Sequence, residues 1–298
     1  MYLRTGAADK SRTKKAMKMK GTFNGSNAVS GVLNFISNIF YGTAAFLIVC
    51  VILCAVFAAY LFKLNSGLPA IADIKSMSAA GGIAISYSQM PDFLSKIIVC
   101  AYDPDFFTHK GLTADNMKTA LVKLYKGENI EFGDRTITQK LASAALAASV
   151  APGAANASSL TSRLRDYLRE NLLAYKIESK IKNKDKILEI YLNNACFGEN
   201  IAGLLQASVV YFNKKPSDLS EADCLTLAAI LKLCRRIGND SDISAVAAER
   251  ENLIKVITGR GLIDKNKADG YKFEDFKLSS YQSKIDKFIR AGFVILRL

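Results

Sequence analysis

The sequence predicts a mainly α-helical protein, with one transmembrane helix near its N-terminus and a helical domain after it. Three observations lead to this prediction. A basic tail precedes an uncharged, apolar run that is long enough to cross a bilayer. In the remainder, apolar residues recur at spacings of three and four, which is the period of a helix. Ser, Thr and Gly residues stand where several of these periodic stretches begin or end, as helix caps do.

The charge pattern at the N-terminus predicts the membrane segment. Residues 1–20 hold seven Lys or Arg and one Asp, and no charged residue occurs from 21 to 62. The segment 39–62 is almost wholly apolar. As a helix it would span roughly 36 Å, enough to cross a hydrocarbon core of about 30 Å. A cleaved signal peptide is the alternative, but the run exceeds the usual apolar core of about 7–15 residues and no clear cleavage motif closes it.

These features divide the chain into three expected parts. Residues 1–35 form a basic cytoplasmic tail, 36–63 a transmembrane helix and 64–298 an extracytoplasmic domain, because positively charged flanks stay on the cytoplasmic side. The protein is thus expected in the inner (plasma) membrane as a single-pass protein. The formal net charge is +13. Much of this charge lies in the tail, and the part after residue 62 has 33 Lys or Arg and 26 Asp or Glu, a net charge of about +7. Outside the membrane this favours lipid head groups, pyrophosphates and cell-wall polymers as partners over nucleic acid.

The cysteines do not form a motif. Two lie in the expected membrane span and four beyond it, without CxxC spacing: Cys50 and Cys54, then Cys100, Cys196, Cys224 and Cys234. We expect buried small hydrophobic side chains. A disulfide among the outer four is allowed by the compartment, although the spacing does not indicate one. A metal site made from them is not expected.

Residues 101–111, AYDPDFFTHKG, hold the densest group of chemically active side chains. Two acids, an aromatic pair, the only histidine and a glycine fall within nine residues: Asp103, Asp105, Phe106, Phe107, His109 and Gly111. An apolar helical run over 90–101 leads into this segment. A loop of this composition is more typical of a site than of packing.

Three further helices are expected after it. Thr113 can cap a helix that runs through Leu124 and ends at Lys126-Gly127. Residues 133–141, GDRTITQKL, open the next helix with a glycine and hydroxyls, so that it is either an ordinary Thr-capped helix or an anion site made by free N–H groups. After a flexible polar loop over 151–160, a long helix covers 162–181. Glu170 lies there on an apolar stripe, so its carboxylate is either paired or desolvated with a raised pKa.

The order Asp103-x-x-Phe106-x-x-His109-x-Gly111 resembles the first signature of the glycosyltransferase family 51 domain. This domain is the peptidoglycan polymerase module of class A penicillin-binding proteins and monofunctional transglycosylases. Residues 133–141 resemble its second signature, and residues 184–232 resemble its fourth and fifth almost throughout. The resemblance covers about residues 85–275 and implies a lysozyme-like helical glycosyltransferase domain. The C-terminal tail, 281–298, is expected either on the membrane or packed on the domain.

The resemblance implies joining of lipid-linked disaccharide-peptide units to a growing glycan strand, with a glutamate as base. At that position this chain has Tyr102, so the expected catalytic residues are Asp103 or Asp105, with Glu170. Basic groups, and in some members a divalent cation such as Mg, stabilise the departing pyrophosphate. The family lysine for this task falls at Ser143. The expected substrate-binding residues are Phe106, His109, Arg135, Thr136, Gln139, Lys140 and Arg169, and no metal ligand is assigned.

The sequence is therefore consistent with two functions. The first is a divergent membrane-anchored peptidoglycan glycosyltransferase acting on lipid II-type substrate. The alternative is a catalytically inactive relative that binds lipid-linked glycan or a cell-wall synthesis partner. The loss of the base at Tyr102 favours the second function, and the retained His109, Thr136, Gln139 and Glu170 favour a working substrate site.

Overall fold

The computed structural model describes residues 25–77, 84–149, 159–198, 201–234 and 240–271. It divides into two compact units, Met1–Lys63 and Leu64–Leu298. Three expected segments lie outside the described residues: most of the basic tail, most of the 151–160 loop and the C-terminal tail 281–298.

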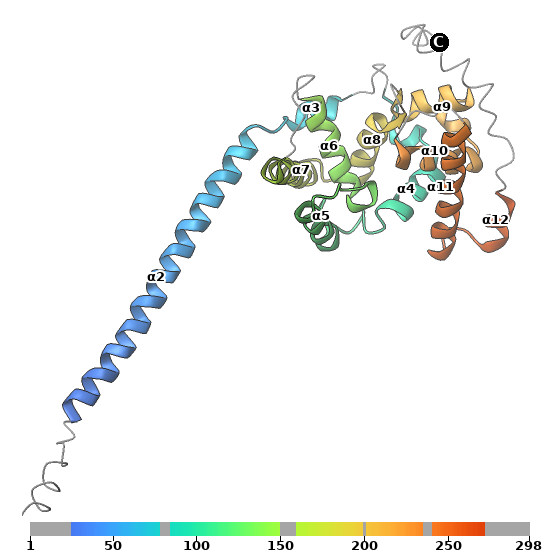
Figure 1. Ribbon diagram of the computed structural model, residues 1–298. Coiled ribbons are helices and arrows are strands. Elements are labelled where there is room, and N and C mark those ends of the chain that lie inside the picture. Colours follow the sequence, from blue (N-terminus) through green and yellow to red (C-terminus); the bar gives the residue numbers. More distant parts are fainter. Residues whose placement is uncertain (1–24, 78–83, 150–158, 199–200, 235–239, 272–298) are drawn as a thin grey trace, which may run out of the picture. The chain divides into compact units, whose positions relative to one another are not determined.

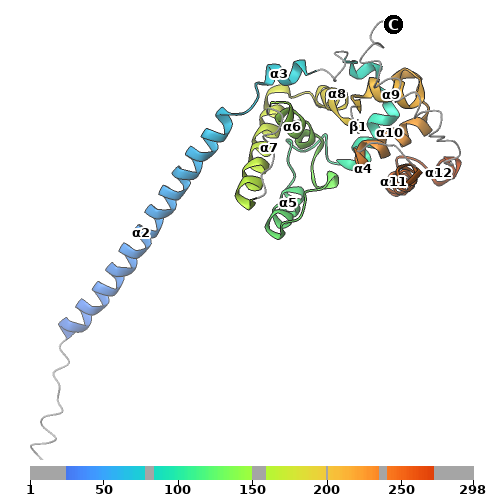
Figure 2. The same ribbon diagram turned by 45° about the horizontal axis from the view of Figure 1, so that its top comes forward.

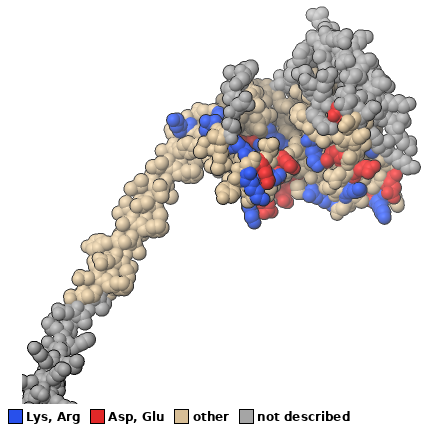
Figure 3. Space-filling view, in the orientation of Figure 1, with Lys and Arg blue, Asp and Glu red and all other residues tan. Residues whose placement is uncertain are grey.

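The first unit is dominated by one long helix, α2 (Gly25–Ser66). Its segment Leu33–Ser66 contains an 18-residue window with a mean hydropathy of 2.9 and no buried residue, so it could cross a membrane by length and composition. Lys63 is its one charged residue, and its described surface is correspondingly uncharged in Figure 3. The helix begins earlier than the apolar run because residues 25–38 contain neither proline nor charge.

The second unit is helical apart from one short hairpin among its described residues, and this confirms the mainly α prediction (Figure 1). Its α-helices are α3 (Ile71–Ser76), α4 (Asp92–Tyr102), α5 (Ala114–Lys126), α6 (Ile137–Ala148), α7 (Leu160–Ile181), α8 (Lys184–Asn194), α9 (Leu204–Phe212), α10 (Glu221–Leu233), α11 (Asp240–Gly259) and α12 (Lys265–Gly270). Strands β1 (Cys196–Gly198) and β2 (Ile201–Ala202) pair antiparallel. Single 3₁₀ turns occupy Tyr87–Gln89, Phe132–Asp134 and Pro216–Asp218.

Two groups of helices share one hydrophobic core. Helix α6 packs on α7 and α8, and α10 packs on α4 and α11 (Figures 1 and 2). The core takes Leu94, Ile97 and Ile98 from α4, all fully buried. Burial of each such side chain contributes about 1.5–3 kcal/mol. The site segment 103–111 therefore leaves a helix that is fixed by packing.

Local capping chemistry sets the helix ends as the sequence predicted. The Thr113 hydroxyl accepts a hydrogen bond from the Asn116 N–H at 3.3 Å at the start of α5, and Gly127 ends this helix in the left-handed region with φ 78°. At the start of α6, Thr136 and Gln139 form a reciprocal capping box. Both predicted helix starts, and the predicted end of α5, are confirmed.

A disulfide joins Cys196 of β1 to Cys234 at the end of α10, with Cα atoms 5.3 Å apart. The expectation that both would be buried hydrophobic side chains is wrong for this pair, because the fold brings together two positions separated by 38 residues. Cys224 does behave as expected and is 1% exposed. The bridge ties the short hairpin to the end of α10.

Candidate active site

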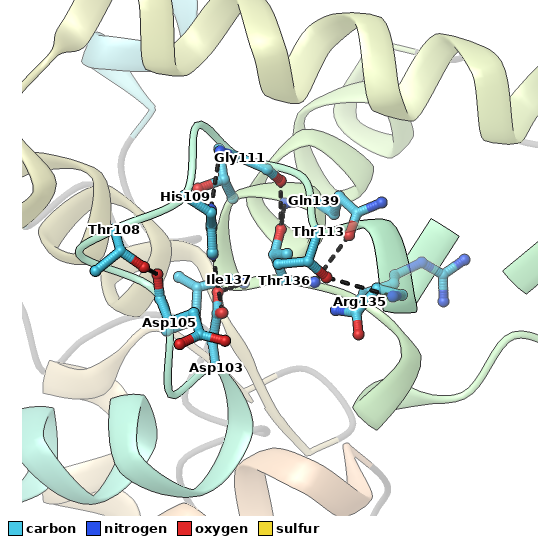
Figure 4. A network of polar contacts seen from close by, with 12 residues as sticks. Asp103, Asp105, Thr108, His109, Gly111, Thr113, Arg135, Thr136, Ile137 and Gln139 are labelled. Atoms are coloured by element: carbon cyan, nitrogen blue, oxygen red, sulfur yellow. Dashed lines mark hydrogen bonds and ion pairs between the residues drawn. The ribbon is translucent and has the colours of Figure 1, made fainter. Parts of the chain in front are cut away.

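Asp103 lies at the lower edge of the polar cluster in Figure 4, with its carboxylate directed toward His109 and Ile137. It follows the last residue of α4, and its side chain is 3% exposed. One carboxylate oxygen is 2.9 Å from His109 Nε2, and the other accepts the Ile137 N–H at 2.7 Å. Both oxygens are thus engaged, and the second one lies at the positive end of the α6 dipole. The carboxylate joins α4, the 103–111 loop and α6.

His109 and Thr136 complete this network. His109 Nδ1 accepts the Gly111 N–H at 2.9 Å, so a neutral imidazole carries its proton on Nε2 and donates it to Asp103. The Thr136 hydroxyl donates to the Gly111 carbonyl at 2.7 Å and accepts the Gln139 N–H at 3.1 Å. Gln139 Nε2 donates to Asn171 Oδ1 of α7 at 2.7 Å. These predicted site residues form one buried hydrogen-bonded network.

Fewer N–H groups are free to bind an anion at the start of α6 than the sequence suggested. A phosphate there would need free N–H groups. The Ile137 N–H already binds Asp103, and the Thr136 and Gln139 N–H groups are engaged in the capping box. The expectation of free N–H groups is wrong for these three positions, because the chain supplies its own carboxylate and caps.

Arg135 and Glu170 form a second polar pair beside the network. Arg135 Nε lies 2.9 and 3.1 Å from the two Glu170 oxygens, and its Nη1 donates to the Ile130 carbonyl at 3.0 Å. The Glu170 side chain is 6% exposed and that of Arg135 is 25% exposed. Burial raises the pKa of Glu170, and the Arg135 guanidinium opposes that rise. Both alternatives expected for Glu170 therefore apply, since it is desolvated and paired.

Lys140 lies on the first turn of α6 and is 8% exposed. Its Nζ donates to the Arg135 carbonyl at 2.8 Å and lies 4.0 Å from the centroid of the Phe132 ring. Burial lowers the pKa of Lys140 to about 7, while the attraction of Asp103 opposes this. The amine is consequently poised between its charged and neutral forms near neutral pH.

Tyr102 is placed for packing. Its ring meets Phe132 edge to face, with centroids 5.1 Å apart, and its hydroxyl donates to the Ala228 carbonyl of α10 at 2.9 Å. Burial raises the pKa of the phenol well above its ordinary value of 10.0. A tyrosine in this state does not accept a proton at neutral pH.

Three predicted site residues remain, Asp105, Phe106 and Arg169, and they differ in their exposure and in the contacts they make. Asp105 is exposed, and its carboxylate has no hydrogen-bond or ion-pair partner among the described residues. Phe106 is fully buried in the core, whereas the neighbouring Phe107 is 57% exposed. Arg169 donates to the Gly67 carbonyl at 3.0 Å, so it bonds the segment that follows α2. The Phe106 N–H donates to the Asp103 carbonyl at 2.9 Å, so this residue supports the loop from the core. Arg169 makes no hydrogen bond or ion pair with the Asp103 network in the described part of the chain.

Sequence reasoning missed a buried ion pair that supports the 103–111 loop. Lys184 Nζ, at the start of α8, donates to the His109 carbonyl at 2.8 Å and to Glu178 Oε1 at 2.7 Å. The same Glu178 oxygen accepts the Thr138 hydroxyl at 2.6 Å. The Glu178 side chain is 7% exposed. A charged residue on the apolar stripe of α7 is the signal that could have indicated such a contact.

The mainly α-helical domain, with this polar network between α4, α6 and α7, fits a helical transglycosylase domain. A family model described as Transglycosylase matches residues 71–257, and the chain belongs to this family. Penicillin-binding protein 1A of Neisseria gonorrhoeae is 32% identical over 142 residues, which is 48% of this chain and 16% of that protein. Penicillin-binding protein 1F of Bacillus subtilis (strain 168) is 29% identical over 161 residues, 54% of this chain and 21% of that protein. The chain thus matches about a fifth or less of the length of these relatives.

Proposed function

We propose that this protein is a membrane-anchored peptidoglycan glycosyltransferase that joins lipid II-type disaccharide units into glycan strands. In this reaction the acceptor hydroxyl attacks the anomeric carbon of the donor sugar and loses its proton to a base. The carbon–oxygen bond to the lipid pyrophosphate breaks, and the pyrophosphate leaves. The observation that supports this most is that the network of Asp103, His109, Thr136 and Gln139 lies inside the domain matched by the transglycosylase family.

Asp105 is the better candidate for the base. Asp103 has both carboxylate oxygens in hydrogen bonds and is almost completely buried. Asp105 is exposed on the same loop, and its carboxylate is unpaired among the described residues. A base must reach the hydroxyl it deprotonates within about 2.6–3.2 Å, so an exposed, unpaired carboxylate suits the task better. Asp103 then orders the loop on which Asp105 lies.

The pyrophosphate would bind to the cations near Glu170. The Arg135 guanidinium is partly exposed. Lys140 lies on the first turn of α6, and its amine donates a hydrogen bond to the Arg135 carbonyl. Glu170 holds the guanidinium through both of its oxygens. Cations placed in advance in a desolvated site stabilise developing negative charge without reorganising. Lys140 and Arg135 thus provide the positive charge that the family lysine provides at the position of Ser143.

The acids near this site do not fit a resident metal ion. Asp103 and Glu170 are engaged with His109 and Arg135, which leaves the Asp105 carboxylate as a single free donor group among the site acids described. No group of three potential ligating side chains occurs within the described residues.

The domain is proposed to lie on the outer side of the membrane. The basic tail before the apolar helix favours a cytoplasmic N-terminus. The disulfide between Cys196 and Cys234 also supports this orientation, because such bonds persist in oxidising compartments and are rare in the cytosol.

One observation favours the alternative function, a catalytically silent protein that binds lipid-linked glycan. The phenol of Tyr102 is engaged with Ala228, so the position that carries the base in the resembling family has no proton acceptor. The two functions make different predictions for the same assay, in which the purified full-length protein is incubated with lipid II and the products are separated by size.

The glycosyltransferase proposal expects polymer from the native protein. The Asp105→Asn variant should lose at least about 100-fold in rate, since general-base catalysis contributes about 10²–10⁴-fold. Asp115→Asn, at an exposed position on α5, is the matched control and should keep its rate. Polymer from a Tyr102→Glu variant with none from the native protein would reject the proposal and support the silent alternative.

A further inference from the structure

The amine of Lys140 is unusual among the lysines that the structure describes in this domain. It is buried, yet it has no carboxylate partner within salt-bridge distance in the part of the chain that the structure describes. Its hydrogen-bond partner is the neutral Arg135 carbonyl, at 2.8 Å. The two nearby acids are bound elsewhere, Asp103 to His109 and Ile137, and Glu170 to Arg135.

The charges around this amine explain why its protonation responds to a ligand. Burial and the positive Arg135 disfavour the ammonium form, whereas Asp103 and Glu170 favour it. Their combined effect leaves the pKa at about 7. A dianion placed against Arg135 would cancel the unfavourable cation and add an attraction of its own, and both changes favour the charged amine.

We propose that Lys140 takes up a proton when a lipid diphosphate binds beside it, so that anion binding at this site is coupled to protonation. This inference rests on the proposed function, because it takes the diphosphate of the glycan lipid as the ligand. The neutral amine lowers the desolvation cost of the empty site, and the ammonium form appears when its counter-charge arrives. The same residue then releases the proton when the diphosphate leaves.

The direction and size of the proton uptake on ligand binding follow from the pKa of Lys140. At pH 7 about half of the amines are neutral if the pKa is about 7, so binding takes up about 0.5 proton at Lys140. Below pH 6 the amine is already charged and uptake disappears. Above pH 8 a whole proton is required, and the affinity falls by about tenfold per pH unit.

Isothermal titration calorimetry of the detergent-solubilised full chain with farnesyl diphosphate tests this proposal. The measurement is made at pH 7.0 in buffers that differ in ionisation enthalpy, and the slope of the observed enthalpy gives the number of protons taken up. The native protein should take up about 0.5 proton more than Lys140→Gln, while proton exchange by the ligand itself is common to both. The Lys123→Gln variant is the matched control, because Lys123 is already paired with Asp134 at 2.7 Å.

The outcomes separate this inference from the proposed function. Tight binding with equal proton uptake in the native protein and Lys140→Gln would overturn the coupling and leave the diphosphate site intact. No binding to the native protein at pH 6 would overturn the diphosphate site itself and the coupling with it. If Lys140→Gln does not fold, the pH dependence of native affinity decides, and equal affinity at pH 7 and pH 9 after correction for ligand ionisation rejects the proposal.

Discussion

Replacing Asp103 by asparagine tests whether this carboxylate builds the site or performs the chemistry. In the native domain its oxygens accept from His109 Nε2 and the Ile137 N–H. An amide presents one oxygen and one NH₂ group, so one of these donors loses its acceptor and faces another donor. Loss of a hydrogen bond to a charged group costs about 1.5–3 kcal/mol, and loss of an anion at a helix N-terminus costs up to about 1 kcal/mol more.

We therefore expect Asp103→Asn to lower the stability of the domain by roughly 3 kcal/mol. For a domain of this size each kcal/mol lowers Tm by about 2–4 °C, which gives a drop of roughly 6–12 °C by scanning calorimetry in detergent. Asp105→Asn is the control and should change Tm by little, because its carboxylate is exposed and unpaired in the described structure. An Asp103→Asn protein with native Tm that has lost its polymerase activity would refute this reasoning and identify Asp103 as the base.

Three further changes probe the supports of the site. Gly111→Ala should destabilise the domain by roughly 2 kcal/mol or more. The reason is that φ at Gly111 is +88° and the new Cβ would lie 3.1 Å from the Ala174 carbonyl oxygen. A variant with the native Tm would contradict this prediction. Lys184→Met should increase amide hydrogen exchange in the 103–111 loop more than elsewhere, whereas Lys186→Met, which removes an ion pair that is more exposed, should not. Reduction of the Cys196–Cys234 bridge should cost roughly 3–4 kcal/mol in urea unfolding, and free thiols in protein taken directly from cells would argue against an extracytoplasmic domain.

Local chemistry made several elements predictable from the sequence. The Thr113 cap and the Gly127 stop are decided within a few residues, and helix α5 lies between them. The burial of Glu170 was also predictable, because the 3.6-residue period places it among apolar side chains on α7. The disulfide and the Lys184 contacts depend on how distant segments meet, and no local pattern carries that information.

The dependence on contacts between distant segments also explains why the expectation of free N–H groups at the start of α6 was wrong. The sequence places hydroxyls and a glycine there and thereby suggests an exposed anion site. It gives no sign that Asp103, 34 positions earlier, reaches the Ile137 N–H. Similarly, Phe106 belongs to the resembling motif, yet its ring is fully buried and contacts the His109 ring edge to face. A motif residue can thus support a site without facing the substrate.

The carboxylate of Asp103 at the head of α6 has a consequence for the design of inhibitors. A compound that presents a phosphate mimic to this helix terminus would have to displace a residue of the protein itself, and with it the hydrogen bond to His109. A compound that presents its negative charge to the Arg135 guanidinium meets a partly exposed cation instead. Acidic groups in a lead molecule should accordingly be directed at the arginine, and their potency should depend on pH to the extent that the neighbouring amine of Lys140 contributes.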